Sequence, residues 1–441
     1  MLRPVLIALM LFAGPVWAAE RVVAPGDGTL AAAIATAAPG DVLRLAPGTH
    51  RGPVVLEKPL TLDGGGQATL DGGGQGSVIT IIGEGAVVRG LVIQGSGSEH
   101  GTIDSGVQIK STAKGALIEN NRLIGNLYGV DAHGGRDCIV RGNLIEGRRD
   151  RRVNDRGNGV YVWNAPGLVV QDNVIDWGRD GIFVSISRKA TFIGNRFTNL
   201  RFAVHYMYAH DSTISGNVSV GNGLGFALMY SERLQVHDNI SLADRAHGLM
   251  LNYANNSDIQ GNLVRGSEKC LFIYNANRNI IADNRFEGCD IGIHFTAGSE
   301  RNAITGNAFV ANRTQVKYVG TRDVEWSVEG RGNYWSDHPA FDLNGDGIAD
   351  SPFRPNDLMD HILWSQPAAA LLTGAPVVQL VRWSQSSFPA TLPGGVVDSA
   401  PLMTPRTIPV RPDDAAAESA ALAARAAQGT EHEQFDPLTA H

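Results

Sequence analysis

The sequence predicts an all-β protein, a right-handed parallel β-helix solenoid with coils of about 22 residues. The first observation is a recurring motif of apolar and polar residues that ends in asparagine, at Asn121, Asn143, Asn173, Asn195, Asn217, Asn239, Asn262, Asn284 and Asn307. The second is its spacing of 22 or 23 residues, with one interval of 30 that carries an insertion around residues 148–158. The third is an excess of glycine, 53 of 441 residues, without the every-third-residue period of collagen.

The physical chemistry of the repeat supports this fold. Each repeat contains short β-branched strands separated by Gly and Asn, which tolerate left-handed turn conformations. Asparagines at one turn position of successive coils can hydrogen-bond amide to amide. The period is too short for TPR, ankyrin or WD40 units, and the leucine pattern of leucine-rich repeats is missing. We therefore expect coils stacked about 4.8 Å apart.

The first eighteen residues have the pattern of a signal peptide. Arg3 gives a positive start, residues 5–13 are apolar, and Val16 and Ala18 occupy the two cleavage-determining positions. A buried N-terminal helix is the alternative. We expect the mature chain to begin at Ala19, outside the cytoplasm, and no later stretch is apolar over the roughly 18 residues of a membrane span.

The mature chain divides into four expected segments. The β-helix should run over residues 19–335, with a short helix at residues 29–38 covering its first coil. An Asp/Asn-rich loop follows at 336–355. Residues 356–410 should form a helical docking segment of two short helices, capped by Asn356 or Asp357 and opened by Pro367. The Ala- and Glu-rich residues 411–441 are expected to be a disordered tail.

The three cysteines leave two interpretations open. In an oxidising compartment an odd count leaves at least one thiol unpaired or bonded to a partner. Cys270 and Cys289 could meet on neighbouring coils, or they and Cys138 could be small buried hydrophobic residues. The net charge of -7 disfavours nucleic-acid binding.

Alternation along the strands places an unusual set of side chains on the outer face. The inward positions between residues 182 and 295 are apolar apart from Tyr206. The outward set on three successive coils, here called the Met–His strip, is His205, Met207, Met229 and Met250. Thioether and imidazole ligands select copper(I), so the strip is a candidate copper site.

Two other interpretations of the strip remain. The C-terminal helices could cover it, or it could bind a protein, because Met and aromatic patches favour interfaces. The aromatic residues expected to face a partner are Phe183, Tyr208, Tyr230, Phe272 and Tyr274. Four nearby histidines are alternative ligands, although each is expected to be an ordinary surface residue: His133, His210, His237 and His247.

A second candidate metal site lies in the loop after the repeat. The loop has side-chain oxygens at Asp342, Asn344, Asp346 and Asp350 and a turn glycine at Gly347. This pattern resembles an EF-hand or dockerin-type calcium loop. Phe353 replaces the final glutamate, so the EF-hand is incomplete. A bare Asx turn is the alternative to structural calcium.

A β-helix also raises the possibility of a polysaccharide-active enzyme, a lyase or uronan epimerase. Asp131 and His133 resemble the Asp-Pro-His-Asp/Glu site of alginate epimerases, but Ala132 replaces the proline and Gly134 the second acid. The outward residues of the following coils, Tyr161, Phe183 and His205, are not the acids that such chemistry needs.

Six segments of the sequence carry a resemblance to a known family: 201–208, 251–254, 268–277, 291–301, 332–337 and 393–399. The most specific of them are the tyrosine- and methionine-containing strand and the late glycine-rich segment. These segments closely resemble the NosD family, periplasmic accessory proteins of nitrous oxide reductase maturation. The resemblance covers residues from about 20 to about 403.

The resemblance implies a function outside catalysis. Proteins of this family are the periplasmic part of an ABC-type complex with a membrane permease and a cytoplasmic ATPase. That complex is implicated in building the copper-sulfur centre of nitrous oxide reductase, with copper delivered by a chaperone lipoprotein. The resemblance implies a soluble docking platform, associated with the membrane through the permease, and no catalytic residues.

Overall fold

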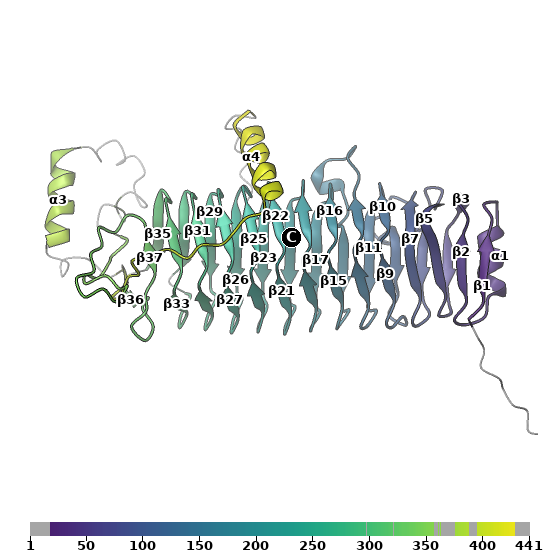
Figure 1. Cartoon of the computed structure of the whole chain (residues 1–441), viewed down its shortest axis with the longest axis horizontal. Helices are drawn as coiled ribbons and strands as arrows, with labels where there is room; N and C mark the ends of the chain where they lie inside the picture. Colours follow the sequence, from purple (N-terminus) through teal and green to yellow (C-terminus); the bar gives the residue numbers. More distant parts are fainter. Residues whose placement is uncertain are drawn as a thin grey trace, which may run out of the picture.

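The chain forms a right-handed parallel β-helix, which confirms the predicted fold class. The computed structural model describes residues 18–427 except 297, 321, 357–359, 361, 363–374 and 388–394. Residues 1–17 of the expected signal peptide and the end of the expected tail lie outside this range. Figure 1 shows a long solenoid with its strands perpendicular to the axis. No helix among the described residues is long and apolar enough to span a membrane.

One wall of the solenoid is a parallel sheet of 12 strands that carries the candidate copper site. Its members, in chain order, are β4 (Val54–Leu56), β6 (Ile79–Ile81), β8 (Ser105–Ile109), β11 (Tyr128–His133), β14 (Val160–Trp163), β17 (Asp180–Ser185), β20 (Phe202–Met207), β23 (Leu224–Met229), β26 (His247–Asn252), β29 (Lys269–Tyr274), β32 (Ile291–Thr296) and β35 (Thr314–Val319).

The remaining walls belong to one 24-stranded sheet, in which each coil contributes two short strands. The strands of the first coils are β1 (Glu20–Val23), β2 (Val42–Leu45), β3 (Gly48–Arg51), β5 (Thr61–Asp71) and β7 (Val87–Gln94). The first strand of each later coil is β9 (Leu117–Glu119), β12 (Ile139–Arg141), β15 (Val169–Gln171), β18 (Thr191–Ile193), β21 (Thr213–Ser215), β24 (Gln235–His237), β27 (Asp258–Gln260), β30 (Ile280–Ala282) or β33 (Ala303–Thr305). The second is β10 (Arg122–Ile124), β13 (Leu144–Glu146), β16 (Val174–Asp176), β19 (Arg196–Thr198), β22 (Val218–Val220), β25 (Ile240–Leu242), β28 (Leu263–Arg265), β31 (Arg285–Glu287), β34 (Ala308–Val310) or β37 (Tyr334–Trp335). The insertion contains a short 3-10 helix, η1 (Val153–Asp155).

The asparagines of the repeat form a continuous buried ladder. Asn195 Nδ2 donates to Asn217 Oδ1 at 3.0 Å, and Asn217 Nδ2 donates to Asn239 Oδ1 at 2.9 Å. The same oxygens accept backbone N–H groups, so each side chain satisfies buried donors that would otherwise be costly. The ladder extends beyond the nine predicted residues to Asn333, which accepts from Asn307 at 2.9 Å.

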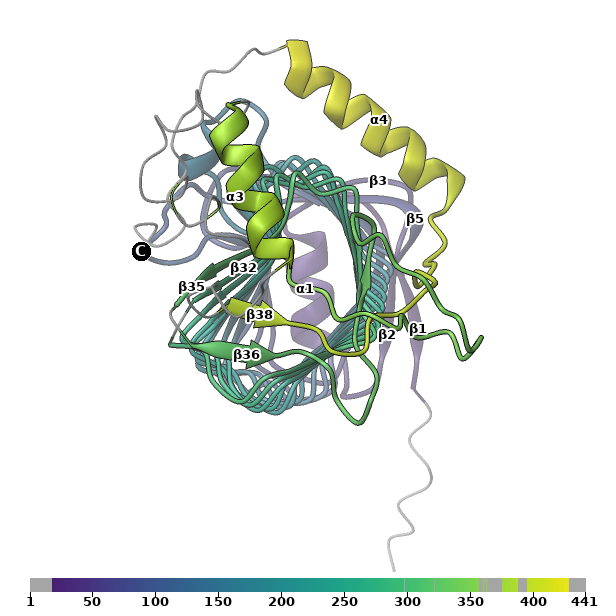
Figure 2. The same ribbon diagram turned by 90° about the vertical axis from the view of Figure 1, so that its left-hand side faces the viewer.

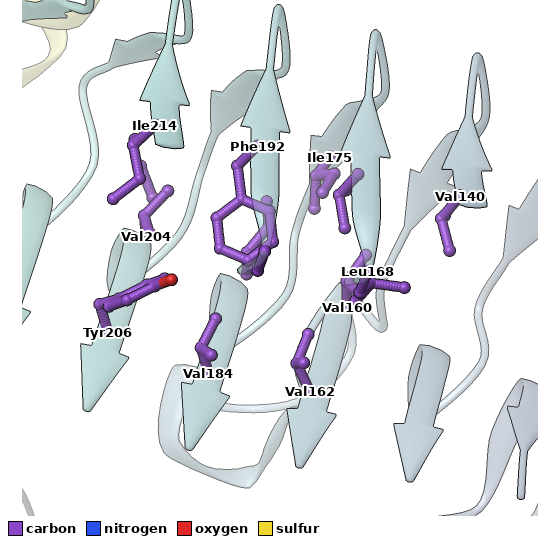
Figure 3. Packing of buried hydrophobic residues seen from close by; sticks show 14 of the residues in the cluster. Val140, Val160, Val162, Leu168, Ile175, Val184, Phe192, Val204, Tyr206 and Ile214 are labelled. Carbon is purple, nitrogen blue, oxygen red and sulfur yellow. The ribbon is translucent and has the colours of Figure 1, made fainter. Parts of the chain in front are cut away.

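The inward residues form one apolar core along the axis, as alternation predicts. Figure 3 shows part of it, where Val162, Val184 and Tyr206 follow one another on neighbouring strands. The rings of Phe192 and Tyr206 pack edge to face with centroids 5.7 Å apart. Stacking of like residues from coil to coil therefore excludes water from the whole interior.

Both ends of the core are covered. At the first coil α1 (Thr29–Thr36) buries Leu30 and shortens the expected helix by two residues. At the last coil β36 (Asp323–Glu325) pairs with β38 (Gly395–Val397). Asp398 then accepts hydrogen bonds from Asn333 N at 2.7 Å and Trp335 Nε1 at 2.8 Å. The late glycine-rich segment thus terminates the asparagine ladder.

The C-terminal region differs from the prediction in its tail. One helix of the expected helical segment is α3 (Pro376–Ser387), whereas Asp357, Pro367 and most of the other expected helix lie outside the described residues. The expectation of a disordered tail is wrong for α4 (Pro412–Ala427). Figures 1 and 2 show α4 lying against the side of the solenoid.

Specific contacts hold α4. Ala417 and Ala421 pack against an apolar cluster that includes Val220, Leu242 and Leu263. Glu418 Oε1 accepts from Arg265 Nε at 2.7 Å, and Asp414 pairs with Arg196. The Ala-rich composition did not predict these contacts. Small Ala side chains allow α4 to lie close to the solenoid, and composition alone does not show this.

The cysteines resolve into one bonded pair and one thiol. Cys270 and Cys289 form a disulfide. Cys138 is buried and free. The first of the two interpretations of the sequence is therefore correct for Cys270 and Cys289, and the second for Cys138.

Candidate metal-binding site on the outer face

A departure from strict alternation in the longer strands of the 12-stranded sheet, such as β20, shapes its outer face. Ala203 and Val204, which are consecutive, both pack in the core, whereas Phe202 belongs to a separate cluster on the outside. A Cβ at Gly181, the position equivalent to Ala203 one coil earlier, would lie 2.5 Å from Ala203 O. Because the small residue before Val204 also packs inward, the residue that precedes it, Phe202, lies on the outer face. The outer face therefore has three columns of side chains, at the positions of Phe202, His205 and Met207, where alternation predicts two.

The Met–His strip lies on three neighbouring strands, β20, β23 and β26. His205 and Met250 lie on either side of Ala227 in strand register, and Met207 lies beside Met229. Neighbouring parallel strands are about 4.8 Å apart, so these flexible side chains can meet above the small Ala227 methyl group. The register therefore places one imidazole and three thioethers on three neighbouring strands, and these donor types suit copper(I).

A buried ion network orients His205. Its Nδ1 lies 3.2 Å from Asp180 Oδ2, which leaves Nε2 as the nitrogen able to bind a metal. Arg201 donates to both Asp180 oxygens, at 2.9 and 2.8 Å. Burial acts to raise the pKa of Asp180, but the hydrogen bonds from His205 and Arg201 outweigh it and hold that pKa below its usual range. A carboxylate behind the distal nitrogen is a common support for metal-binding histidines.

The strip is more buried than its outward position predicts. His205 is 4% exposed, Met229 3% and Met250 0%. Met229 and Met250 pack with Phe202, Leu224, Ala227 and Phe272, and Met207 lies at the edge of that cluster. The additional outward column explains much of this packing, because Phe202 and Leu224 fill space that two columns would leave open.

The partner-facing residues divide by exposure. Tyr208 and Tyr274 are exposed, Phe183 and Tyr230 are half-buried, and Phe272 is buried. Tyr208, Tyr230, Tyr253 and Tyr274, here called the tyrosine ladder, follow one another on successive coils; the first two ring pairs stack at 5.0 and 5.1 Å. For Phe272 the expectation of an accessible side chain is wrong, because it packs between His247 and His294.

Sequence reasoning misplaced His247. It is 3% exposed, not a surface residue, and its ring centroid lies 5.2 Å from that of Phe272. Strict alternation would place His247 inward with Leu249 and Leu251, but the bend at Gly248 turns it to the outer face. The signal was present in the sequence as the column of small residues Gly181, Ala203, Gly225 and Gly248.

The Asp/Asn-rich loop closes on itself. Asp342 accepts from Gly345 N at 2.6 Å and Gly347 N at 2.8 Å, and Asn344 Oδ1 accepts from Asp346 N at 2.9 Å. Asp350 Oδ2 accepts from Leu343 N at 2.7 Å. In the described part of the chain no three His, Cys, Asp or Glu side chains gather as a metal site. The structure thus gives calcium no support, because the acidic oxygens are turned toward backbone donors.

The Asp131 region is enclosed. Asp131 is fully buried, and its Oδ2 accepts from Gln108 Nε2 at 3.0 Å. Gln108 Nε2 also donates to Thr102 O at 3.3 Å, which fixes the loop before β8 close to this carboxylate. Burial raises the pKa of Asp131 to about 7. A carboxylate without access to solvent cannot act on a polysaccharide in this conformation.

Comparisons with known proteins agree on the fold and the family. Residues 141–340 match the family described as periplasmic copper-binding protein (NosD). A probable ABC transporter binding protein NosD of Stutzerimonas stutzeri is 41% identical over 375 residues, 82% of this chain and 86% of the relative. A protein of the same description from Pseudomonas aeruginosa is 38% identical over 81% of this chain and 87% of its own.

Solved structures share the architecture at low identity. An alginate lyase matches 72% of this chain and 92% of its own, with a TM-score of 0.50 and 13% identity. That likeness concerns the β-helix alone. On the strength of its close relatives, this chain belongs to the NosD family of periplasmic ABC transporter binding proteins.

Proposed function

We propose that this protein is the periplasmic component of an ABC-type complex that assembles or supplies the copper-sulfur centre of nitrous oxide reductase. In this role the chain binds copper(I) transiently and positions other proteins, and it catalyses no reaction itself. Its partners are the permease and ATPase subunits, a copper chaperone lipoprotein and the reductase. It is soluble and reaches the membrane through the permease.

The arrangement of the Met–His strip carries the proposal. His205 and Met250 flank Ala227 in strand register, Met207 and Met229 pair two residues further along, and His205 is oriented by Asp180. Thioether sulfur prefers copper(I) over the harder divalent ions, and a dry apolar surround protects that oxidation state from water. The strip is part of a cluster whose other members are Phe202, Leu224 and Phe272.

The tyrosine ladder is the proposed docking surface. It begins next to Met207 in the chain, and Tyr208 and Tyr253 are 48% and 40% exposed. Tyrosine is enriched at interfaces because its ring buries apolar area while its hydroxyl remains able to hydrogen-bond. A partner seated on the ladder would lie directly beside the copper-binding side chains.

The alternative of a polysaccharide-active enzyme receives less support. Asp131 is enclosed, and the next outward residue of its column is Tyr161. The relatives are named as binding proteins. Incubating the protein with alginate and finding unsaturated or epimerised sugars would establish the enzyme instead.

Maturation in cells tests the proposal. We expect the double variant Met207→Ala/Met229→Ala, made in the producing organism, to lower nitrous oxide reduction at least tenfold and to lower the copper content of the purified reductase. The variant Tyr208→Ser/Tyr253→Ser should lower both in the same way, although the purified variant should still bind copper(I). The reason is that the first variant removes donors and the second removes only docking area.

Met403→Ala is the matched control. Met403 lies far from the strip, beyond the last coil, where its N–H donates to Gly347 O. It should leave reductase activity unchanged. Full reductase activity in the Met207→Ala/Met229→Ala strain, with the variant present at normal level, would contradict the proposal.

A further inference from the structure

A buried carboxylate lies at the start of the first strand of the solenoid. Asp41, in the turn before β2, is 2% exposed. Its Oδ1 accepts a hydrogen bond from Ala19 N at 3.0 Å, and its Oδ2 accepts from Ala38 N at 2.9 Å. The Arg21 guanidinium pairs with Oδ2 at 3.0 Å. The two carboxylate oxygens therefore connect the beginning of β1 to the turn that follows α1.

The first strand depends on few other contacts. β1 pairs in parallel with β2, and no other described strand pairs with it. Ala19 is hydrogen-bonded at both ends, because its carbonyl also accepts from Val42 N at 2.9 Å. Figure 1 shows β1 beside α1 at one end of the solenoid. A strand with a single neighbour opens more readily than one inside a sheet, so the hydrogen bonds at Ala19 matter for the first coil.

The nitrogen that faces Asp41 is also the expected mature N-terminus. A peptidase that removes signal peptides would hydrolyse the Ala18–Ala19 bond with one water molecule. The Ala18 carbonyl carbon gains the hydroxyl and leaves with the leader as a carboxylate, and Ala19 N becomes a free amine. An α-amine has a pKa of about 8, so at neutral pH most of it is protonated. Cleavage thus replaces a neutral N–H donor with an ammonium group at the same atom.

We propose that Asp41 binds the α-ammonium group of Ala19 in the processed chain, so that removal of the leader strengthens the first coil. A hydrogen bond between two charged groups is shorter and stronger than one from a neutral amide. This inference rests on the expected signal peptide and is independent of the Met–His strip and of copper binding.

The charges around Asp41 suit this role. Hydrogen bonds from Ala38 N and Ala19 N hold the pKa of Asp41 below its usual range, so the carboxylate is ionised at neutral pH. Arg21 contacts the other oxygen, and its side chain is 41% exposed. Water and salt therefore screen the repulsion between Arg21 and the ammonium group.

The processed chain can be compared with a chain in which Gly-Ser precedes Ala19, so that Ala19 N remains an amide. We expect amide hydrogen exchange in β1 at pH 7 to be at least tenfold slower in the processed chain. In Asp41→Asn the same two forms should exchange at similar rates, because a neutral amide attracts the ammonium group much less. Any general loss of stability in Asp41→Asn affects both of its forms and cancels in the comparison. Asp27→Asn is the matched control and should keep the full difference, since the Asp27 side chain is 98% exposed.

The pKa of the Ala19 α-amine, measured by NMR in the processed protein, is the second readout. The Asp41 carboxylate should raise this pKa above about 8, and Asp41→Asn should return it to about 8. The added stability of β1 should be present below about pH 8 and be lost as the pH rises through the raised pKa. Equal exchange in the processed and extended chains, or the same α-amine pKa in the wild type and Asp41→Asn, would overturn the proposal. A periplasmic chain whose mass shows that it does not begin at Ala19 would overturn it as well.

Discussion

At His205 the two ring nitrogens have separate roles. Nδ1 faces Asp180, whose carboxylate is also held by two hydrogen bonds from Arg201, and Nε2 is left for a ligand. The buried carboxylate keeps the imidazole in one orientation, so a metal would meet a preformed donor. A single residue of the strip thus depends on an ion network that starts one strand earlier.

Asp131 provides a residue-scale prediction. Its pKa is raised to about 7 by burial, so the folded state favours the neutral acid. This contribution to stability is present below pH about 4 and is lost as the pH rises through about 7. The shift corresponds to at most about 4 kcal/mol. We expect Asp131→Asn to be more stable than the wild type at pH 8 and equally stable below pH 4.

Denaturant unfolding at several pH values measures this difference. The exposed Asp137→Asn is the matched control and should follow the wild type throughout. A pH dependence of stability that is the same in Asp131→Asn and in the wild type would contradict the assignment.

At the scale of elements, α4 forms a helix although the composition of its segment predicts disorder. It contacts the solenoid where glycine allows a close approach: a Cβ at Gly221 would lie 2.9 Å from Ala421 Cβ. Gly221 and Gly216 have similar left-handed backbones, with φ of 67° and 62°, but a Cβ at Gly216 would contact nothing within 4 Å. The two glycines therefore separate backbone strain from contact with α4.

Gly221→Ala should loosen α4, and Gly216→Ala should not. Both variants carry the cost of a left-handed alanine, about 1–2 kcal/mol. Only the first also pushes Ala421 away, which we expect to lower the free energy of α4 opening by about 1–3 kcal/mol. Amide hydrogen exchange in α4 measures that opening. Equal exchange in the two variants would show that the contact at Ala421 does not hold the helix.

The elements also show where sequence reasoning stops. Periodicity and alternation predicted the coils, the asparagine ladder and the inward core, because each depends on one residue and its neighbours at a fixed spacing. The bend at Gly248 breaks alternation, and so Lys269 was missed as an outward residue and the burial of His247 was not anticipated. Docking of α4 depends on Arg196 and Arg265, which lie more than 150 residues away from their acidic partners, and no local pattern encodes such a pairing.

For the whole molecule, the β-helix acts as a rigid frame that fixes one side chain per coil in each outer column. The Met–His strip lies in register along the 12-stranded sheet, and the tyrosine ladder follows directly after the ends of β20, β23 and β26. The resemblance to the NosD family was readable from residues 201–208, and close relatives confirm it. The burial of Met229 and Met250 could not be predicted from the sequence, because it depends on Phe202 and Leu224 in the third outward column.

Copper(I) titration of the mature protein, under anaerobic conditions with a competing chelator, tests the central claim most directly. We predict stoichiometric binding by the wild type and by Met403→Ala, and at least a hundredfold weaker binding by Met207→Ala/Met229→Ala, because two of four donors are lost. Binding of equal affinity in the double variant would place copper elsewhere on the chain. Absence of binding in all three proteins would contradict the claim that this chain holds the metal.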